Sequence, residues 1–265
     1  MQEYFAGKVC LVTGAASGLG MQLVRGLLAC NAVVYMADAD PRALAHVQPE
    51  DGPDNIIPVI TDVTRAEQVD ALVATALKYN GRLDMLFNTA GVSMACPGNT
   101  ISLDDWHQQM NINLWGVIHG QHYALPVMRR QKRGHIINCS SVAGLRTQPH
   151  QRAYCGTKSA VTVIAESLRD HAGDDGITVT TVHPGNGITD MARGDALRQE
   201  DTIPADKAAR IILKAVSRQD PIVLLPESAT NCNEQRRRDS HYYEQVMRDV
   251  ALARRHYYSC AGLYF

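Results

Sequence analysis

Seven short apolar runs alternate with longer amphipathic stretches between residues 8 and 226. The runs are nearly continuous in apolar character and rich in β-branched residues, which is typical of parallel strands that are covered on both faces. The stretches between them carry apolar residues at three- and four-residue spacing, as amphipathic helices do. This alternation predicts an α/β fold with a doubly wound, Rossmann-type parallel sheet. The expected strands are residues 9–12, 33–36, 56–60, 83–87, 136–137, 177–182 and 222–225.

The pattern predicts a single catalytic domain over residues 1–226, followed by an extension over residues 227–265. Helices are expected at residues 22–30, 104–132 and 152–171, and Thr64 with Glu67 is a candidate capping box for another. The extension holds five of the ten tyrosines and a possible long helix at residues 234–255. It is expected either to pack on the domain or a partner subunit, or to close over the substrate pocket.

Charge and cysteine usage exclude several classes of protein. The net charge of −1 provides no basic field for nucleic acid, and no apolar run reaches the 18 residues of a membrane span. The chain begins without a basic segment, so no secretory signal is expected. The seven cysteines are scattered and lack metal-ligand spacing, which favours a reducing compartment and no metal site. We therefore expect a cytoplasmic protein.

A glycine-rich turn follows the first predicted strand directly. Gly14, Gly18 and Gly20 lie between that strand and a predicted helix. Glycines at this place let the backbone approach a pyrophosphate, whose charge is favoured by the N–H groups and the dipole of the helix terminus. Ser17 can add a hydroxyl to a phosphate or a ribose. The turn therefore predicts a dinucleotide site.

An acidic residue at the end of the second predicted strand bears on the choice of dinucleotide. Asp38 lies eighteen residues after Gly20. A carboxylate there can accept both hydroxyls of the adenosine ribose and would repel a 2′-phosphate. No basic residue stands at positions 15, 16 or 39, and Arg42 is expected to be solvated. NAD(H) is therefore expected rather than NADP(H).

A tyrosine and a lysine lie four residues apart in a predicted helix, thirteen residues after Ser141. Tyr154 and Lys158 therefore share one helix face. Tyrosine has an ordinary pKa near ~10 and is a poor base at neutral pH. The charge of Lys158, with that of an oxidised nicotinamide, is expected to lower the pKa of Tyr154 toward working pH. Ser141 can orient the oxygen of a substrate. The arrangement predicts proton transfer at a carbon–oxygen bond.

Together and in this order, these elements resemble the short-chain dehydrogenase/reductase family over about residues 6–226. The turn from Thr13 to Gly20 is similar to Thr-Gly-x-x-x-Gly-x-Gly, and residues 88–91 resemble Asn-Asn-Ala-Gly. The resemblance implies a catalytic set of Asn113, Ser141, Tyr154 and Lys158. It also implies cofactor contacts by Gly14, Ser17, Gly18, Leu19, Gly20, Asp38, Asp62, Val63, Asn88, Ala90, Gly91, Tyr154, Lys158, Pro184, Gly187 and Thr189.

Within the implied set, Asp62 and Val63 match the pair that contacts adenine, and Lys158 can bond the nicotinamide ribose. Asn113 can hold a water that continues the proton path. Pro184 to Thr189 matches the segment on the nicotinamide side.

Three features depart from the family pattern. Thr89 stands in place of the second asparagine, and Gly187 in place of valine or isoleucine. The chain also ends in an aromatic tail instead of the common Asp-Gly-Gly close. The first two changes are expected to tune cofactor binding, and the third leaves the geometry of any oligomer open.

The sequence thus predicts an oxidoreductase that transfers a hydride between NAD(H) and a secondary alcohol or ketone, and a homo-oligomer, either a dimer or a tetramer. Two alternatives stay open: a non-redox isomerase or dehydratase, and a non-catalytic NAD(H)-responsive binding protein. The substrate pocket is expected at residues 93–98, 144–152 and 186–202, where apolar and polar side chains are mixed. No residue there identifies the substrate.

Overall fold

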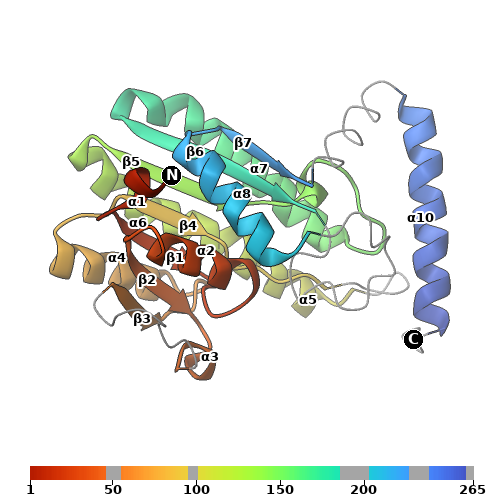
Figure 1. The fold of residues 1–265 in the computed structure, drawn as a ribbon. Coiled ribbons are helices and arrows are strands. Elements are labelled where there is room, and N and C mark those ends of the chain that lie inside the picture. Colours follow the sequence, from red (N-terminus) through yellow and green to blue (C-terminus); the bar gives the residue numbers. More distant parts are fainter. Residues whose placement is uncertain (46–54, 95–100, 186–202, 227–238, 261–265) are drawn as a thin grey trace.

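The computed structural model describes residues 1–45, 55–94, 101–185, 203–226 and 239–260 (Figure 1). Its centre is a seven-stranded sheet in the order β3-β2-β1-β4-β5-β6-β7, and every neighbouring pair is parallel. All seven predicted strands and the Rossmann-type architecture are confirmed. The strands are β1 (Val9–Thr13), β2 (Val33–Asp38), β3 (Ile56–Ile60), β4 (Met85–Asn88), β5 (Gly134–Cys139), β6 (Ile177–Pro184) and β7 (Ile222–Leu225).

The order of the strands reverses at β1. The chain first builds β2 and β3 on one side of β1 and then returns to place β4 on the other side. The last paired residues of these two central strands are Thr13 and Asn88. In open parallel sheets, ligands bind in the crevice that such a reversal leaves beyond the carboxyl ends of the strands. The topology therefore places the candidate site beyond Thr13 and Asn88.

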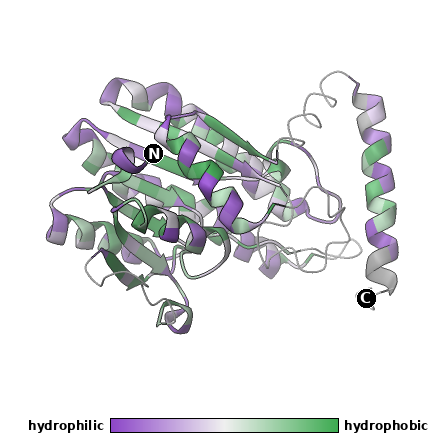
Figure 2. Ribbon diagram, viewed as in Figure 1, coloured by the Kyte–Doolittle hydropathy of each residue, from purple (hydrophilic) through white to green (hydrophobic). Residues whose placement is uncertain are grey.

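Helices cover both faces of the sheet. Cys10 and Val12 pack on the face of α2 (Gly18–Leu28) and α8 (Ala205–Ser217). Val9 and Leu11 point the other way, as the two-residue period of a strand requires. That second face is covered by α4 (Ala66–Asn80), α6 (Gly116–Gln131) and α7 (Arg152–Ala172). Figure 2 shows mostly apolar strands between helices of mixed character, which explains the continuous apolar runs in the sequence.

The helix expected at residues 104–132 consists of three segments. α5 (Leu103–Met110) leads through a π-helical turn, η1 (Asn111–Trp115), into α6. A π-turn adds one residue to a helical turn, which shifts the side chains that follow around the helix axis. A three- or four-residue apolar period continues on both sides, so the pattern alone does not reveal the insertion.

The predicted capping box at Thr64 and Glu67 is wrong. α4 begins at Ala66 with Arg65 as its N-cap, and no side chain caps it. The hydroxyl of Thr64 instead donates to the carboxylate of Asp62 at 2.8 Å. A carboxylate two residues upstream competes for the threonine, which forms an Asx turn and not a cap. The capping box that the structure does contain joins Ser102 and Asp105 at the start of α5.

The predicted helix in the C-terminal extension is confirmed, with later bounds. α10 spans Ser240–Cys260 and lies beyond the carboxyl-terminal edge of the sheet in Figure 1. The remaining short elements are α1 (Gln2–Phe5), α3 (Pro41–Ala45), η2 (Val142–Gly144) and η3 (Gly173–Asp175). None of the helices in the described ranges is long and apolar enough to cross a membrane.

A buried histidine ties the opposite, amino-terminal edge of the sheet together. The Nε2 atom of His135 lies 2.8 Å from the hydroxyl oxygen of Thr180, which itself donates to the carbonyl of Asp220. His135 Nε2 is therefore the donor, and Nδ1 accepts from the hydroxyl of Tyr4 at 3.1 Å. Both ring nitrogens are satisfied only in the neutral imidazole. Burial, with the nearby positive charge of Lys8, lowers the pKa of His135 to about 3.

This pKa makes stability depend on pH. The unfolded chain binds a proton at His135 below pH ~6.5, whereas the folded chain does not until about pH 3, so stability falls as the pH drops through that window. We expect His135→Gln to be less stable than wild type at pH 7. The difference in free energy of unfolding should shrink by about 2 kcal/mol at pH 4.5. Urea unfolding at both pH values measures it, with exposed His171→Gln as the control. Equal pH dependence in wild type and His135→Gln would contradict the assignment.

Candidate active site

The glycine turn is shaped by contacts within the protein. Gly14 has φ 64°, in the left-handed region, and a Cβ atom there would lie 2.7 Å from the Cα of Ala90. A Cβ atom on Gly20 would overlap the carbonyl oxygen of Gly14. Gly18 also has a positive φ, of 50°. The turn therefore needs glycine to fit between the end of β4 and the start of α2.

The start of α2 offers free backbone donors at this crevice. Ser17 is the N-cap in an extended conformation, and its side chain makes no capping hydrogen bond. Within the described residues, the N–H groups of Gly18, Leu19 and Gly20 have no acceptor. Such groups, together with the helix dipole, favour a phosphate. The predicted cofactor residues of the turn thus form a donor set that fits a pyrophosphate.

Asp38 lies where β2 ends, beside the turn. One carboxylate oxygen accepts from the N–H of Ala16 at 3.0 Å, and the other accepts from the N–H of Asp40 at 3.1 Å. These bonds fix the half-buried carboxylate next to the glycine turn. The side chain of Arg42 is exposed, as expected.

A threonine pair joins the ends of β1 and β4. The hydroxyl oxygen of Thr13 accepts from the N–H groups of Thr89 at 3.1 Å and Ala90 at 3.2 Å. The hydroxyl of Thr89 donates to the carbonyl of Thr13. The departure from asparagine at position 89 therefore brings a short side chain that bonds across the crevice. Asn88 donates to the amide oxygen of Asn138 at 2.9 Å and is buried, so only its backbone reaches this edge.

The loop after β3 is held on the other side of the crevice. Asp62 accepts from both the N–H and the hydroxyl of Thr64. Val63 is buried, and its carbonyl lies 2.9 Å from Nδ1 of His119. A Cβ atom on Gly116 would come within 2.8 Å of the Val63 side chain. The predicted adenine-side pair is thus fixed against the start of α6.

Asn113 links the segment after β4 to α7. Its amide oxygen accepts from the N–H of Val92 at 2.7 Å, and its amide nitrogen donates to the carbonyl of Val92 at 2.8 Å and to Thr157 at 3.2 Å. The side chain is fully buried and lies in the π-turn η1. π-turns are frequent at functional sites because they redirect a side chain. Asn113 holds protein groups here, whereas the sequence suggested that it holds a water.

Ser141 reaches Tyr154 because η2 packs directly on the backbone of α7. A Cβ atom on Gly144 would lie 2.6 Å from the carbonyl oxygen of Lys158. Ser140 donates to that same carbonyl at 2.8 Å. The Ser141 hydroxyl accepts from the N–H of Ala143, donates to the carbonyl of Pro184 at 3.2 Å and forms a hydrogen bond with the phenol of Tyr154.

The electrostatics of the pair differ from the prediction. Burial raises the pKa of Tyr154 above its ordinary value, and the hydrogen bond with Ser141 lowers it in part. Lys158 is buried, donates to the carbonyl of Cys139 at 2.9 Å and lies 5.7 Å from the centre of the Tyr154 ring. Burial also lowers the pKa of Lys158. The expected depression of the Tyr154 pKa is therefore absent from this structure, because the loss of hydration outweighs the lysine charge.

The structure thus gathers Asn113, Ser141, Tyr154 and Lys158 around the carboxyl ends of β4, β5 and β6. Two predicted cofactor residues, Gly187 and Thr189, lie outside the described residues, as do parts of the expected substrate pocket. Three residues that support the site were missing from the prediction: Thr13, Ser140 and Gly144. The glycine three residues after Ser141 was the available signal, since a close backbone approach requires one.

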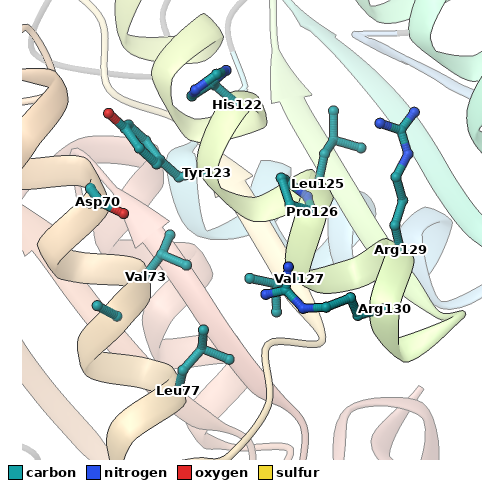
Figure 3. A pocket seen from close by; sticks show the side chains of 11 residues that line it. Asp70, Val73, Leu77, His122, Tyr123, Leu125, Pro126, Val127, Arg129 and Arg130 are labelled. Atoms are coloured by element: carbon teal, nitrogen blue, oxygen red, sulfur yellow. The ribbon is translucent and has the colours of Figure 1, made fainter.

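A surface groove of about 540 Å³ lies between α4 and α6 (Figure 3). It is lined by apolar side chains such as Val73 and Leu77, with His122 and Arg129 among its polar residues. None of the predicted catalytic or cofactor residues lines this groove. No cluster of three or more histidines, cysteines or acidic residues in the described parts of the chain could hold a metal ion.

Known proteins share this sequence pattern and fold. Residues 8–200 match the family described as short chain dehydrogenase. An uncharacterized oxidoreductase from Staphylococcus saprophyticus is 36% identical over 221 residues, which cover 79% of this chain and 90% of that protein.

Solved structures agree. A short-chain dehydrogenase/reductase from Burkholderia phymatum, in complex with NAD, is 28% identical with a TM-score of 0.80, covering 90% of this chain and 95% of that one. A short-chain dehydrogenase from Burkholderia cenocepacia, in complex with NADP, shares the fold at 24% identity and a TM-score of 0.81, covering 92% and 98%. The match over residues 8–200, together with the curated relative, shows that this chain belongs to the short-chain dehydrogenase/reductase family of oxidoreductases.

Proposed function

We propose that this chain transfers a hydride between NAD(H) and a secondary alcohol or ketone, with Tyr154 as the acid or base. The observation that carries the proposal is the hydrogen-bonded pair of Tyr154 and Ser141 beside a buried Lys158 ammonium. The pair lies at the carboxyl-terminal edge of the sheet, on the same edge as the glycine turn. Ligands of this sheet topology bind at that edge.

The residues of the crevice fit a nicotinamide dinucleotide. The free N–H groups at the start of α2 would hold the pyrophosphate, and Asp38 would accept the adenosine ribose hydroxyls. Lys158 would reach the nicotinamide ribose from α7. When bound, NAD(H) supplies or accepts the hydride, which no side chain of the protein can do.

Tyr154 supplies the proton that balances the hydride. In the reductive direction the carbonyl carbon gains a hydride and the carbonyl oxygen gains the phenolic proton, which yields the alcohol. Because burial keeps the phenol protonated, Tyr154 is suited to donate. In the oxidative direction the phenolate accepts the proton of the alcohol, and it depends on nearby positive charge. The hydroxyl of Ser141 orients the substrate oxygen in both directions.

The preference for NAD(H) is supported by the surroundings of Asp38. Its carboxylate is fixed by two backbone N–H groups at the place where a 2′-phosphate would lie. Its neighbours Ala15, Ala16 and Ala39 carry no charge. Two negative groups at this spot would repel each other, and no neighbouring cation offsets them.

The acid–base role predicts the outcome of removing one oxygen atom. Tyr154→Phe should lower kcat on the order of 10²- to 10⁴-fold, because positioned proton transfer is lost. The affinity for NADH should stay within about twofold, since the ring and Lys158 remain. Absorbance at 340 nm with a panel of secondary alcohols and ketones measures turnover, and NADH fluorescence measures binding. Tyr123→Phe, on the outer face of α6, is the matched control. Wild-type turnover by Tyr154→Phe would refute the role. Turnover without net absorbance change in wild type would favour an isomerase.

The role of Asp38 predicts a change in cofactor choice. Asp38→Asn removes the charge but keeps an oxygen for the N–H of Ala16. The ratio of kcat/KM with NAD⁺ to kcat/KM with NADP⁺ should fall at least about tenfold, or ~1.4 kcal/mol. Asp40→Asn removes the same charge two residues away and should leave the ratio near that of wild type. A ratio unchanged in Asp38→Asn would mean that another group selects the cofactor.

A further inference from the structure

The C-terminal helix contributes one deeply buried charged side chain. Arg254 on α10 is 1% exposed, although other side chains of this helix, such as Tyr242 and Leu252, are more than half exposed. Its guanidinium donates to the carbonyl of Pro149 at 2.6 Å and to the side-chain oxygen of Gln148 at 3.3 Å. Burying a guanidinium is costly unless its donors are satisfied. These contacts are therefore an anchor of α10 on the domain.

The anchored segment leads directly into the catalytic helix. Gln148 donates from its backbone N–H to the sulfur of Cys155 at 3.2 Å, and that thiol lies 3.8 Å from the carbonyl of Gln148. Cys155 is the residue next to Tyr154. Burial raises the pKa of the Cys155 thiol, which its bond with Gln148 and the charge of Arg254 oppose in part. Arg254 is thus connected to the first turn of α7 through Gln148 and Cys155.

The same segment contains a conformation that needs support. His150 has φ 65°, in the left-handed region that non-glycine residues rarely adopt. Its Nε2 atom lies 3.5 Å from the carbonyl oxygen of Ala251 on α10. Ala251 and Arg254 are three residues apart, so they share one face of the helix. That face meets two neighbouring residues, Pro149 and His150, just before α7 begins.

We propose that Arg254 is a positioning residue for Tyr154: it holds the segment from Gln148 to Gln151 and thereby fixes the start of the catalytic helix. The inference rests on the proposed function, because it concerns the placement of the acid–base group. α10 then belongs to the catalytic unit and is more than a surface appendage. Displacement of a catalytic group by about 1 Å can cost on the order of 10²-fold in rate. Small movements of this segment therefore have measurable consequences.

The test compares full-length variants of neighbouring arginines. Arg254→Met keeps the side-chain length but removes the donors, Arg254→Lys keeps the charge with a single-point donor, and exposed Arg255→Met is the control. For each variant, kcat and KM are measured with NAD⁺ and the secondary alcohol that wild type oxidises fastest. The dissociation constant of NADH and the hydrogen exchange of amides 148–155 are measured alongside.

We expect kcat of Arg254→Met to fall roughly tenfold to 10²-fold, with a smaller change in KM and with NADH affinity within about twofold. Amides 148–155 should exchange at least about tenfold faster, while the strands of the sheet exchange as in wild type. Arg254→Lys should lie between the two, and Arg255→Met should match wild type.

Two results would overturn the proposal. The first is wild-type kcat and wild-type exchange at residues 148–155 in Arg254→Met. The second is an equal loss of kcat, NADH affinity and strand protection, which would show general destabilisation instead of positioning. If wild type turns over no alcohol or ketone, the proposed function fails separately. Exchange at residues 148–155, measured with NADH present, then still decides whether Arg254 holds the segment.

Discussion

The whole candidate site depends on how closely the backbone at the end of β1 approaches the end of β4. Gly14 lies so near Ala90 that no Cβ atom fits between them, and Thr13 and Thr89 bond across the same gap. This contact closes the sheet reversal from inside and leaves the start of α2 facing outward with unpaired N–H groups. A wider turn would allow a side chain at position 14, but it would move those donors away from the crevice.

Burial sets the chemical character of the catalytic residues. The site removes Tyr154 and Lys158 from water, which raises the pKa of the phenol and lowers that of the ammonium. Both shifts favour the neutral forms. Hydrogen bonds oppose them: Ser141 on the phenol, and the carbonyl of Cys139 on the ammonium. The protonation of the pair is therefore sensitive to any charge that enters the crevice, which suits a reaction in which a nicotinamide gains or loses positive charge.

The fold was readable from the sequence because each strand is buried on both faces. Runs such as Ile56–Ile60 have no polar alternation, so they identify parallel strands and, in alternation with helices, the whole architecture. The catalytic residues were readable because their spacing is local. Contacts that depend on competing partners were not: Thr64 chose Asp62 over a helix cap, and Asn113 chose the backbone of Val92. Arg254 gave no signal, because its partners lie 105 and 106 residues away.

The start of α7 is held from two sides by elements of different kinds. On one side, η2 packs on the helix backbone through Gly144 and Ser140, which is a contact between rigid, fully buried parts. On the other side, Arg254 holds the preceding segment through two hydrogen bonds from a helix with exposed flanks. Rigid packing fixes Ser141 relative to Lys158 whatever occupies the crevice. The Arg254 contact is the more adaptable of the two, since it can break without opening the core. Variation in the position of Tyr154 should therefore arise on the α10 side of the site.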